Sequence, residues 1–148
     1  MISGATAGHH SMSNVASDPV GLRSCSVNAA IPVSDMATAR SFYEGRLGLG
    51  QGSELPHGAR LYACADQTAL VIYPCPTSAG LANATVAGWN VENVEQMVDR
   101  LSSAGVVFER HDDPGVTTDA KGIHTTATGM RSAFFRDPDG NSFAVIGR

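Results

Sequence analysis

The chain has 148 residues, of which 43% are hydrophobic and 16% are charged, and its formal net charge at pH 7 is −4. This length and hydrophobic content favour one folded domain with its own core over a disulfide-stapled peptide or a disordered tail. The negative balance, without a cluster of Lys or Arg, argues against nucleic acid as a partner, because phosphate binding needs concentrated positive charge.

Residues 1–22 are rich in Ser, Gly and Ala, a composition that predicts a flexible N-terminal arm ahead of a single domain at residues 23–148. The arm has no Lys or Arg and no apolar run of the length found in secretory signals. No later segment approaches the length of a membrane span. The cysteines form no C-x-x-C pair, so we expect neither a disulfide framework nor a thiolate zinc site. These features predict a cytoplasmic protein that binds neither membrane nor nucleic acid.

A strand followed by a helix is predicted at residues 25–49. Pro32 lies near the end of the strand, where the missing N–H of proline is tolerated. Asp35 is a typical helix N-cap residue, and the apolar residues after it recur at intervals of three and four, the pattern of a helix that buries one face. Those apolar residues are Met36, Ala39, Phe42, Tyr43 and Leu47.

Two β-hairpins are predicted, one in each half of the chain. The first covers residues 61–73, with its turn at Asp66 and Gln67. The second joins residues 132–135 to residues 142–146 through the turn Asp-Pro-Asp-Gly, which has proline at its second position and glycine where a positive φ is needed. The polar stretch between Arg110 and Gly129 is long for a connection, and it therefore indicates a lid or binding loop.

Residues 86–106 repeat the order of the first strand and helix. Val91 and Asn93 stand in the places of Val33 and Asp35, and one constant spacing relates both pairs. A duplicated module explains this regularity with the fewest assumptions.

Two stretches of the sequence match a known family pattern. They are Ile-Pro-Val-Ser-Asp-Met-Ala-Thr-Ala-Arg-Ser-Phe-Tyr-Glu-Gly-Arg-Leu-Gly-Leu at residues 31–49 and Phe-Arg-Asp-Pro-Asp-Gly-Asn-Ser-Phe-Ala at residues 135–144. With the second helix, they resemble the vicinal oxygen chelate family, which includes glyoxalase I, the bleomycin-resistance proteins and the extradiol dioxygenases. The resemblance implies an α+β fold of two tandem βαβββ modules, whose strands form a curled mixed-sheet cup with the helices outside and a ligand inside.

The resemblance also implies where the metal ligands of the family would lie in this chain. Those positions are Asn28, Val71, Val86 and Ala144. Zinc, iron and nickel need several imidazole, carboxylate or amide oxygen donors, whereas three of these side chains are aliphatic and have none. We therefore expect no metal and no cofactor, which disfavours glyoxalase and dioxygenase chemistry without affecting the fold.

The cup is then predicted to bind a small molecule. Asn28 offers one amide donor and one acceptor, and Tyr73 offers a ring and a hydroxyl for the cup wall. His124, in the polar stretch, would cover the ligand. The apolar floor would consist of Val71, Val86 and Ala144.

Each polar candidate also has a purely structural interpretation. Asn28 would then hydrogen-bond a neighbouring backbone group, Tyr73 would pack with its hydroxyl in solvent, and His124 would be an exposed loop residue. Trp89 alternates with the cup-facing positions of its strand, so we expect it to point toward the helices.

Two functions remain open. The first is a metal-free protein that binds a small, partly aromatic molecule, as bleomycin-resistance proteins do. The second is an enzyme of the same fold, either a lyase or isomerase that uses His124 or Asp119 as a base, or a glyoxalase-like or dioxygenase-like protein with a differently placed site. The resemblance further implies a homodimer with cups at or near the subunit boundary.

Overall fold

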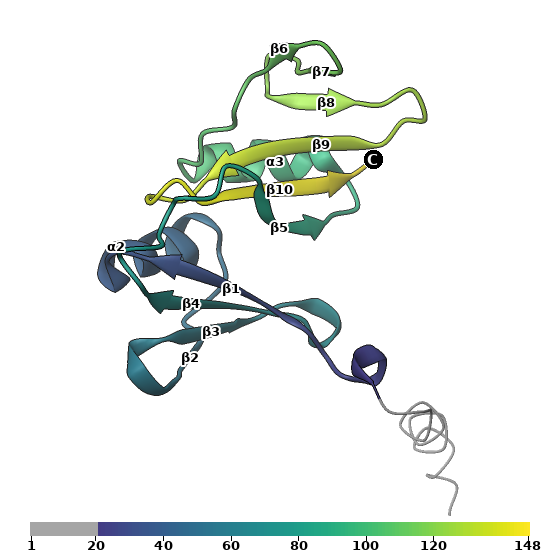
Figure 1. Ribbon diagram of the computed structural model, residues 1–148. Helices are drawn as coiled ribbons and strands as arrows, with labels where there is room; N and C mark the ends of the chain where they lie inside the picture. The colour runs from purple at the N-terminus through teal and green to yellow at the C-terminus, as the bar shows by residue number, and fades with distance from the viewer. Residues whose placement is uncertain (1–20) are drawn as a thin grey trace, which may run out of the picture.

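Two mixed sheets of four strands each form the framework of the computed structural model, which describes residues 21–148 (Figure 1). Sheet A has the strand order β1-β4-β3-β2, and sheet B has the order β5-β10-β9-β8. β1 pairs in parallel with β4 in sheet A, and β5 pairs in parallel with β10 in sheet B. The other neighbouring strands are antiparallel. Sheet A consists of β1 (Asn28–Val33), β2 (Ser53–Glu54), β3 (Arg60–Ala63) and β4 (Ala69–Pro74). Sheet B consists of β5 (Thr85–Asn90), β8 (Ile123–Thr125), β9 (Arg131–Arg136) and β10 (Ser142–Gly147).

The remaining elements complete two βαβββ modules, as the sequence predicted. Module 1 contains α2 (Met36–Arg40), which continues into η3 (Ser41–Arg46), and module 2 contains α3 (Val94–Ser103). A two-stranded hairpin, β6 (Asp112–Asp113) and β7 (Val116–Thr117), is inserted in module 2 ahead of β8. Among the described residues, three short 3-10 turns lie at Leu22–Ser24, Pro56–Gly58 and Ala65–Gln67. No helix in the described part of the chain is long and apolar enough to cross a membrane.

The two modules begin their helices in the same way. The Asp35 side chain accepts a hydrogen bond of 3.0 Å from the Thr38 backbone N–H, and the Asn93 side chain accepts one of 2.9 Å from Gln96. Each bond satisfies a donor that a helix start leaves without an intrahelical partner. The predicted duplication therefore extends to the capping interaction.

The helix of module 1 widens at its end. The backbone N–H of Leu47 donates to Phe42 O over five residues instead of four, so η3 is a π-type turn. This turn buries both Phe42 and Tyr43. The two rings meet edge to face with their centroids 5.3 Å apart.

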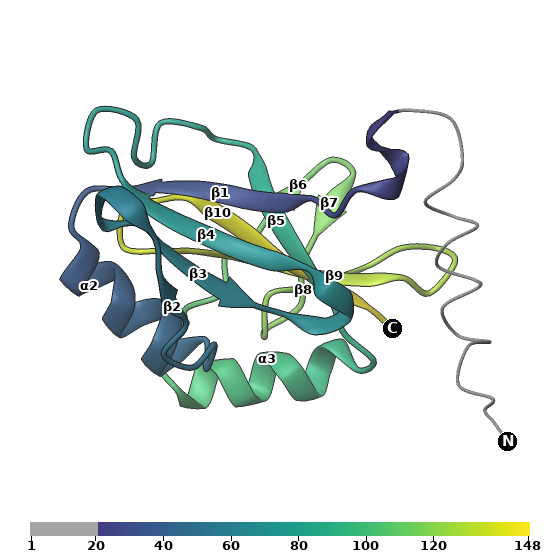
Figure 2. The same ribbon diagram turned by 90° about the horizontal axis from the view of Figure 1, so that it is seen from below.

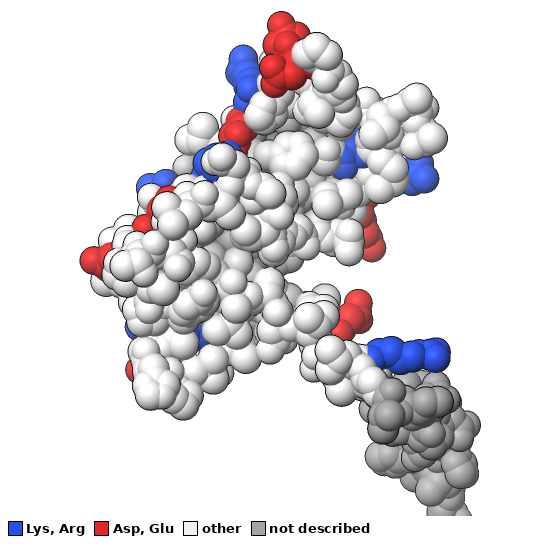
Figure 3. All heavy atoms as spheres, viewed as in Figure 1, with Lys and Arg blue, Asp and Glu red and all other residues white. Residues whose placement is uncertain are grey.

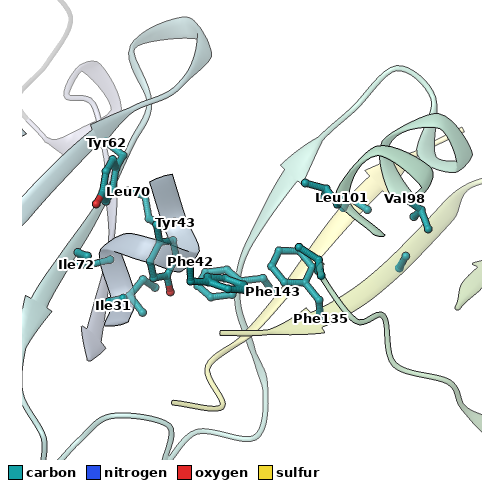
Figure 4. Close-up of a cluster of buried hydrophobic side chains, with 14 of the residues drawn as sticks. Ile31, Phe42, Tyr43, Tyr62, Leu70, Ile72, Val98, Leu101, Phe135 and Phe143 are labelled. Atoms are coloured by element: carbon teal, nitrogen blue, oxygen red, sulfur yellow. The ribbon is translucent and has the colours of Figure 1, made fainter. Parts of the chain in front are cut away.

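Both helices, α2 and α3, cover the same side of the sheets (Figure 2). The core between the helices and the sheets is continuous, because Phe42 and Tyr43 lie between the aliphatic side chains of sheet A and the phenylalanines of sheet B (Figure 4). Phe42 contacts Phe135 across the modules, with ring centroids 6.3 Å apart. One hydrophobic core therefore joins both halves of the chain.

The opposite side of the sheets is called the open face here. It consists of alternate strand residues, starting from Asn28 in β1, Ala69 in β4, Val86 in β5 and Ser142 in β10. In sheet A and in β5 these residues are more exposed than their helix-facing neighbours. The open face is therefore the side of the two curled sheets that the helices leave uncovered.

A polar junction fastens module 2 to module 1. The buried carboxylate of Asp137 accepts a 2.6 Å hydrogen bond from the Tyr43 hydroxyl and a 2.8 Å bond from the Asn141 side-chain amide. The same amide donates to Pro32 O, and the Asn141 side-chain oxygen accepts from the Gly80 N–H. The Asp-Pro-Asp-Gly turn thus positions the two modules in addition to closing a hairpin.

The polar stretch between Arg110 and Gly129 differs from the expected loop. It contains the β6–β7 hairpin and then β8, so His124 lies in the edge strand of sheet B. A three-residue strand with two polar residues lacks the apolar alternation by which strands are predicted. The predicted N-terminal arm, residues 1–22, lies outside the described residues except for Gly21 and Leu22.

Candidate functional site

A cleft of about 470 Å³ lies between the edge strands β1 and β5. It is lined by the start of β1, the turn between β3 and β4 with the start of β4, and β5 from Val86 to Asn90. The space-filling view shows a notch between the two lobes, with largely uncharged walls (Figure 3). Because each sheet contributes one unpaired strand edge, the cleft follows directly from the two-sheet topology.

Asn28 and Val86 are the predicted site residues that meet in this cleft. Asn28 begins β1 and is exposed, and Val86 in β5 is 38% exposed. The cleft therefore has a polar amide on the sheet A side and an aliphatic side chain on the sheet B side.

Val71 and Tyr73 lie farther along the open face of sheet A and do not line the cleft. The strand register shows that Val71 and Ala144 occupy equivalent places, because Val71 pairs with Ala30 in β1 and Ala144 pairs with Gly88 in β5. Val71 and Tyr73 are partly exposed, whereas Ala144 is only 1% exposed. Ala144 therefore offers little accessible surface within a single chain.

His124 and Asp119 occupy the far edge of sheet B. His124 pairs with Ser132 of β9, and its ring Nδ1 lies 3.0 Å from Thr117 O in the inserted hairpin. The Asp119 carboxylate accepts backbone hydrogen bonds of 2.9 Å each from Lys121 and Ile123. Both side chains therefore help to shape the connection between β7 and β8.

The four positions at which the family resemblance implies metal ligands do not fit a transition metal. Val71, Val86 and Ala144 carry no donor atom, and the single amide of Asn28 is too weak a ligand set for zinc, iron or nickel. Within residues 21–148, no group of three or more His, Cys, Asp or Glu side chains is arranged to hold a metal ion.

Trp89 is a cleft residue that the sequence did not single out for function. Its indole points toward the helices, as predicted, and stacks on Phe135 with ring centroids 6.2 Å apart and an interplanar angle of 18°. Because β5 is an edge strand, Trp89 is only partly buried, and the residue forms part of the cleft lining. Alternation correctly predicted the direction of the side chain, but the edge position depends on strand order.

The cleft also contains polar residues outside the predicted set, among them Asp66 and Asn90. Asp66, in the turn between β3 and β4, has a positive φ of 55° and an exposed carboxylate, and Asn90 ends β5 with an exposed amide. Asp and Asn tolerate the left-handed region better than most residues, so the turn explains the residue type at Asp66. Asp66 lines a cleft that only the folded chain creates.

The chain matches the model of the Glyoxalase/Bleomycin resistance protein/Dioxygenase superfamily over residues 26–145. Among solved structures, it is similar to a glyoxalase/bleomycin resistance protein from Catenulispora acidiphila, with 23% identity, coverage of 83% of this chain and 97% of that chain, and a TM-score of 0.62. A lactoylglutathione lyase from Agrobacterium tumefaciens shares 20% identity, with coverage of 84% and 93% and a TM-score of 0.62.

An antibiotic binding protein from a Streptomyces species shares 24% identity, with coverage of 85% of this chain and 97% of that chain and a TM-score of 0.58. Likeness at these identities shows the fold alone. Among curated proteins, no sequence matches the chain significantly.

Proposed function

Because the chain belongs to the glyoxalase/bleomycin resistance protein/dioxygenase superfamily, we propose that it binds a small, partly aromatic molecule without a metal held by the protein. The ligand lies in the cleft between Asn28 and Val86 and extends over the open face. On sheet A it reaches Val71 and Tyr73, and on sheet B it reaches His124 across the position of the buried Ala144. The antibiotic binding protein from Streptomyces gives a precedent for such a role on this fold.

The chemistry of the four implied ligand positions carries this proposal. Aliphatic side chains at Val71, Val86 and Ala144 suit the floor of a small-molecule site, which is mostly apolar with a few placed polar groups. Asn28 and Tyr73 supply such groups. The hydrogen bonds of His124 and Asp119 within the sheet edge give no specific support to the alternative of a lyase or isomerase.

Metal analysis tests the first part of the proposal. We expect protein purified from cells grown with added zinc, nickel and iron to contain far less than one of these ions per chain. Elemental analysis by mass spectrometry measures the content directly. About one ion per chain, lost together with an activity on chelation, would contradict the proposal.

Ligand binding tests the second part. A ligand found by screening should lose affinity for Val86→Trp, because the larger side chain fills the cleft. Val107→Trp is the matched control, since Val107 is 81% exposed and does not line the cleft. Calorimetric titration showing equal affinity for the wild type and Val86→Trp would place the ligand elsewhere.

His124 is tested by the same titrations. If its ring contributes a buried hydrogen bond to the ligand, His124→Ala should weaken binding by roughly 1 to 3 kcal/mol. The control is His57→Asn, because His57 has a positive φ of 62° that asparagine tolerates. An equal loss of ligand affinity in both variants would show that His124 does not contact the ligand.

A second copy of the chain completes the proposed site. Asn28 and Val86 meet in the cleft, but the other four residues lie on parts of the open face that are separate within one chain. A partner packed against the open face would enclose a ligand between sheets of different subunits.

A further inference from the structure

The cleft between β1 and β5 has an uneven distribution of chemical groups. Its lining includes Trp89 and Asp66, but no Lys, Arg or His among the described residues. We propose that this cleft selects uncharged or cationic aromatic ligands over anions, with Trp89 as the stacking surface and Asp66 as the group that sets the charge preference. This inference rests on the proposed function, because it assigns the ligand to the same cleft.

Trp89 has the support that a stacking surface needs. Behind it, Phe135 stacks at an interplanar angle of 18°, and Phe143 packs at a centroid distance of 5.6 Å. Both phenylalanines are buried in the core, at 1% and 0% exposure. The indole is thus held in a fixed orientation, which lowers the entropy cost of stacking a ligand on its accessible surface.

The charge preference follows from what the cleft offers to each kind of ion. A carboxylate or phosphate that enters it loses hydration and finds no cationic side chain in the lining, and burial of an unpaired charge is costly. Asp66 adds repulsion for anions and attraction for cations, and the net charge of −4 acts in the same direction. Carboxylate-bearing substrates such as glutathione thioesters are therefore disfavoured.

Three probes with one ring system measure this preference on the full-length chain. They are 4-nitrobenzylamine, a cation at pH 7, 4-nitrobenzyl alcohol, which is uncharged, and the anion 4-nitrobenzoate. Nitroaromatic rings quench indole emission, and Trp89 is the single tryptophan of the chain. Saturable quenching therefore reports binding near Trp89, after correction for collisional quenching with N-acetyltryptophanamide.

We expect the cation to bind roughly two- to fivefold more tightly than the alcohol, the range for exposed charge pairs, and the anion to bind more weakly than both. High salt should reduce these differences, because exposed charges are screened. Asp66→Asn should bring the affinities of the cation and the alcohol together. Glu54→Gln is the matched control, since it removes the same charge from an exposed residue of β2 outside the cleft.

Calorimetric titration of two Trp89 variants tests the stacking. Trp89→Leu should weaken binding of all three probes by roughly three- to tenfold without changing their order. Trp89→Phe keeps a ring against the core and should lie between the wild type and Trp89→Leu, so it remains informative if the leucine variant does not fold.

Each result bears on a separate part of the inference. Affinities that are equal for the three probes would overturn the charge preference and leave the binding cleft in place. An unchanged cation preference in Asp66→Asn would remove Asp66 from that role, and unchanged affinities in both Trp89 variants would overturn the stacking. Failure of all three probes to bind the wild type would overturn the cleft as a ligand site, and the proposed function with it.

Discussion

At the scale of single residues, buried tyrosines connect the helix of module 1 to both sheets. Tyr43 donates to Asp137 of module 2, and Tyr62 of β3 donates to the Glu44 carboxylate over 2.8 Å. The two rings also stack, with centroids 6.2 Å apart. Each tyrosine thus buries a large ring and satisfies its hydroxyl, the combination that a buried tyrosine requires.

The raised pKa values of these tyrosines predict how the unfolding free energy changes at alkaline pH. Burial, as the larger cause, and the hydrogen bond to Glu44 together raise the pKa of Tyr62 from 10.0 to about 12. Burial also raises the pKa of Tyr43. Because the folded state holds the proton more tightly than the unfolded state, this stabilisation is complete below pH 10 and is lost as the pH rises through about 12. The unfolding free energy should therefore fall over this interval.

Urea unfolding at a series of pH values from 9 upward measures the effect. In Tyr62→Phe the fall should be shallower than in the wild type, because one group that titrates differently in the two states has been removed. An identical slope in both proteins would show that Tyr62 does not contribute.

At the scale of elements, a side-chain cap stabilises the start of each of the two helices. Asn93→Ala should lower the unfolding free energy by about 1 kcal/mol, because it removes the acceptor for the Gln96 N–H. Ser102→Ala is a suitable control, since Ser102 is exposed in the same helix and its side chain caps nothing. Equal effects of the two substitutions in chemical denaturation would mean that the cap contributes nothing measurable.

Elements also differ in how clearly their sequences predict them. Asp35, Asn93 and Gly105 mark helix ends, and Gly105 has the positive φ, 98°, expected after a helix. The strand β8 has no such signal, because it is short, polar and paired on one side with β9. Its position is determined by its partner strand and not by its own composition.

At the scale of the whole molecule, the junction at the Asp-Pro-Asp-Gly turn sets how the modules meet. A Cβ at Gly80 would collide with the backbone oxygen of Asp139, and Gly80 also has a φ of 70°. Gly80→Ala should therefore destabilise the fold more than Gly50→Ala, because Gly50 has a similar φ of 77° but nothing within 4 Å of its Cβ position. Thermal unfolding compares the stabilities of the two variants. An equal loss of stability in both would show that the junction accommodates the added methyl group without destabilising the fold.

The proposed homodimer also belongs to this scale. The open face exposes aliphatic and aromatic surface, and a charged fraction of 16% is low for a chain that exposes all of its surface. We expect sedimentation equilibrium to give about twice the chain mass of 15.4 kDa. A mass of one chain at every concentration would exclude the dimer and the enclosed site that depends on it.

The sequence by itself determined the features that depend on local order along the chain. Alternating apolar residues, N-caps and turn residues predicted both helices, both hairpins and the duplication, because these patterns act over a few residues. The family resemblance placed Val71 and Ala144 in equivalent positions, which the strand register confirms.

Only the tertiary structure decided which surfaces meet. Strand order made β1 and β5 edge strands, and this opened the cleft that brings Asn28 and Val86 together, leaves part of Trp89 accessible and gives the cleft the charge of Asp66. It also placed His124 at the opposite edge of sheet B. The physical reason is that contacts between residues far apart in sequence depend on how the two modules pack, and side-chain periodicity within one strand or helix carries no information about that packing.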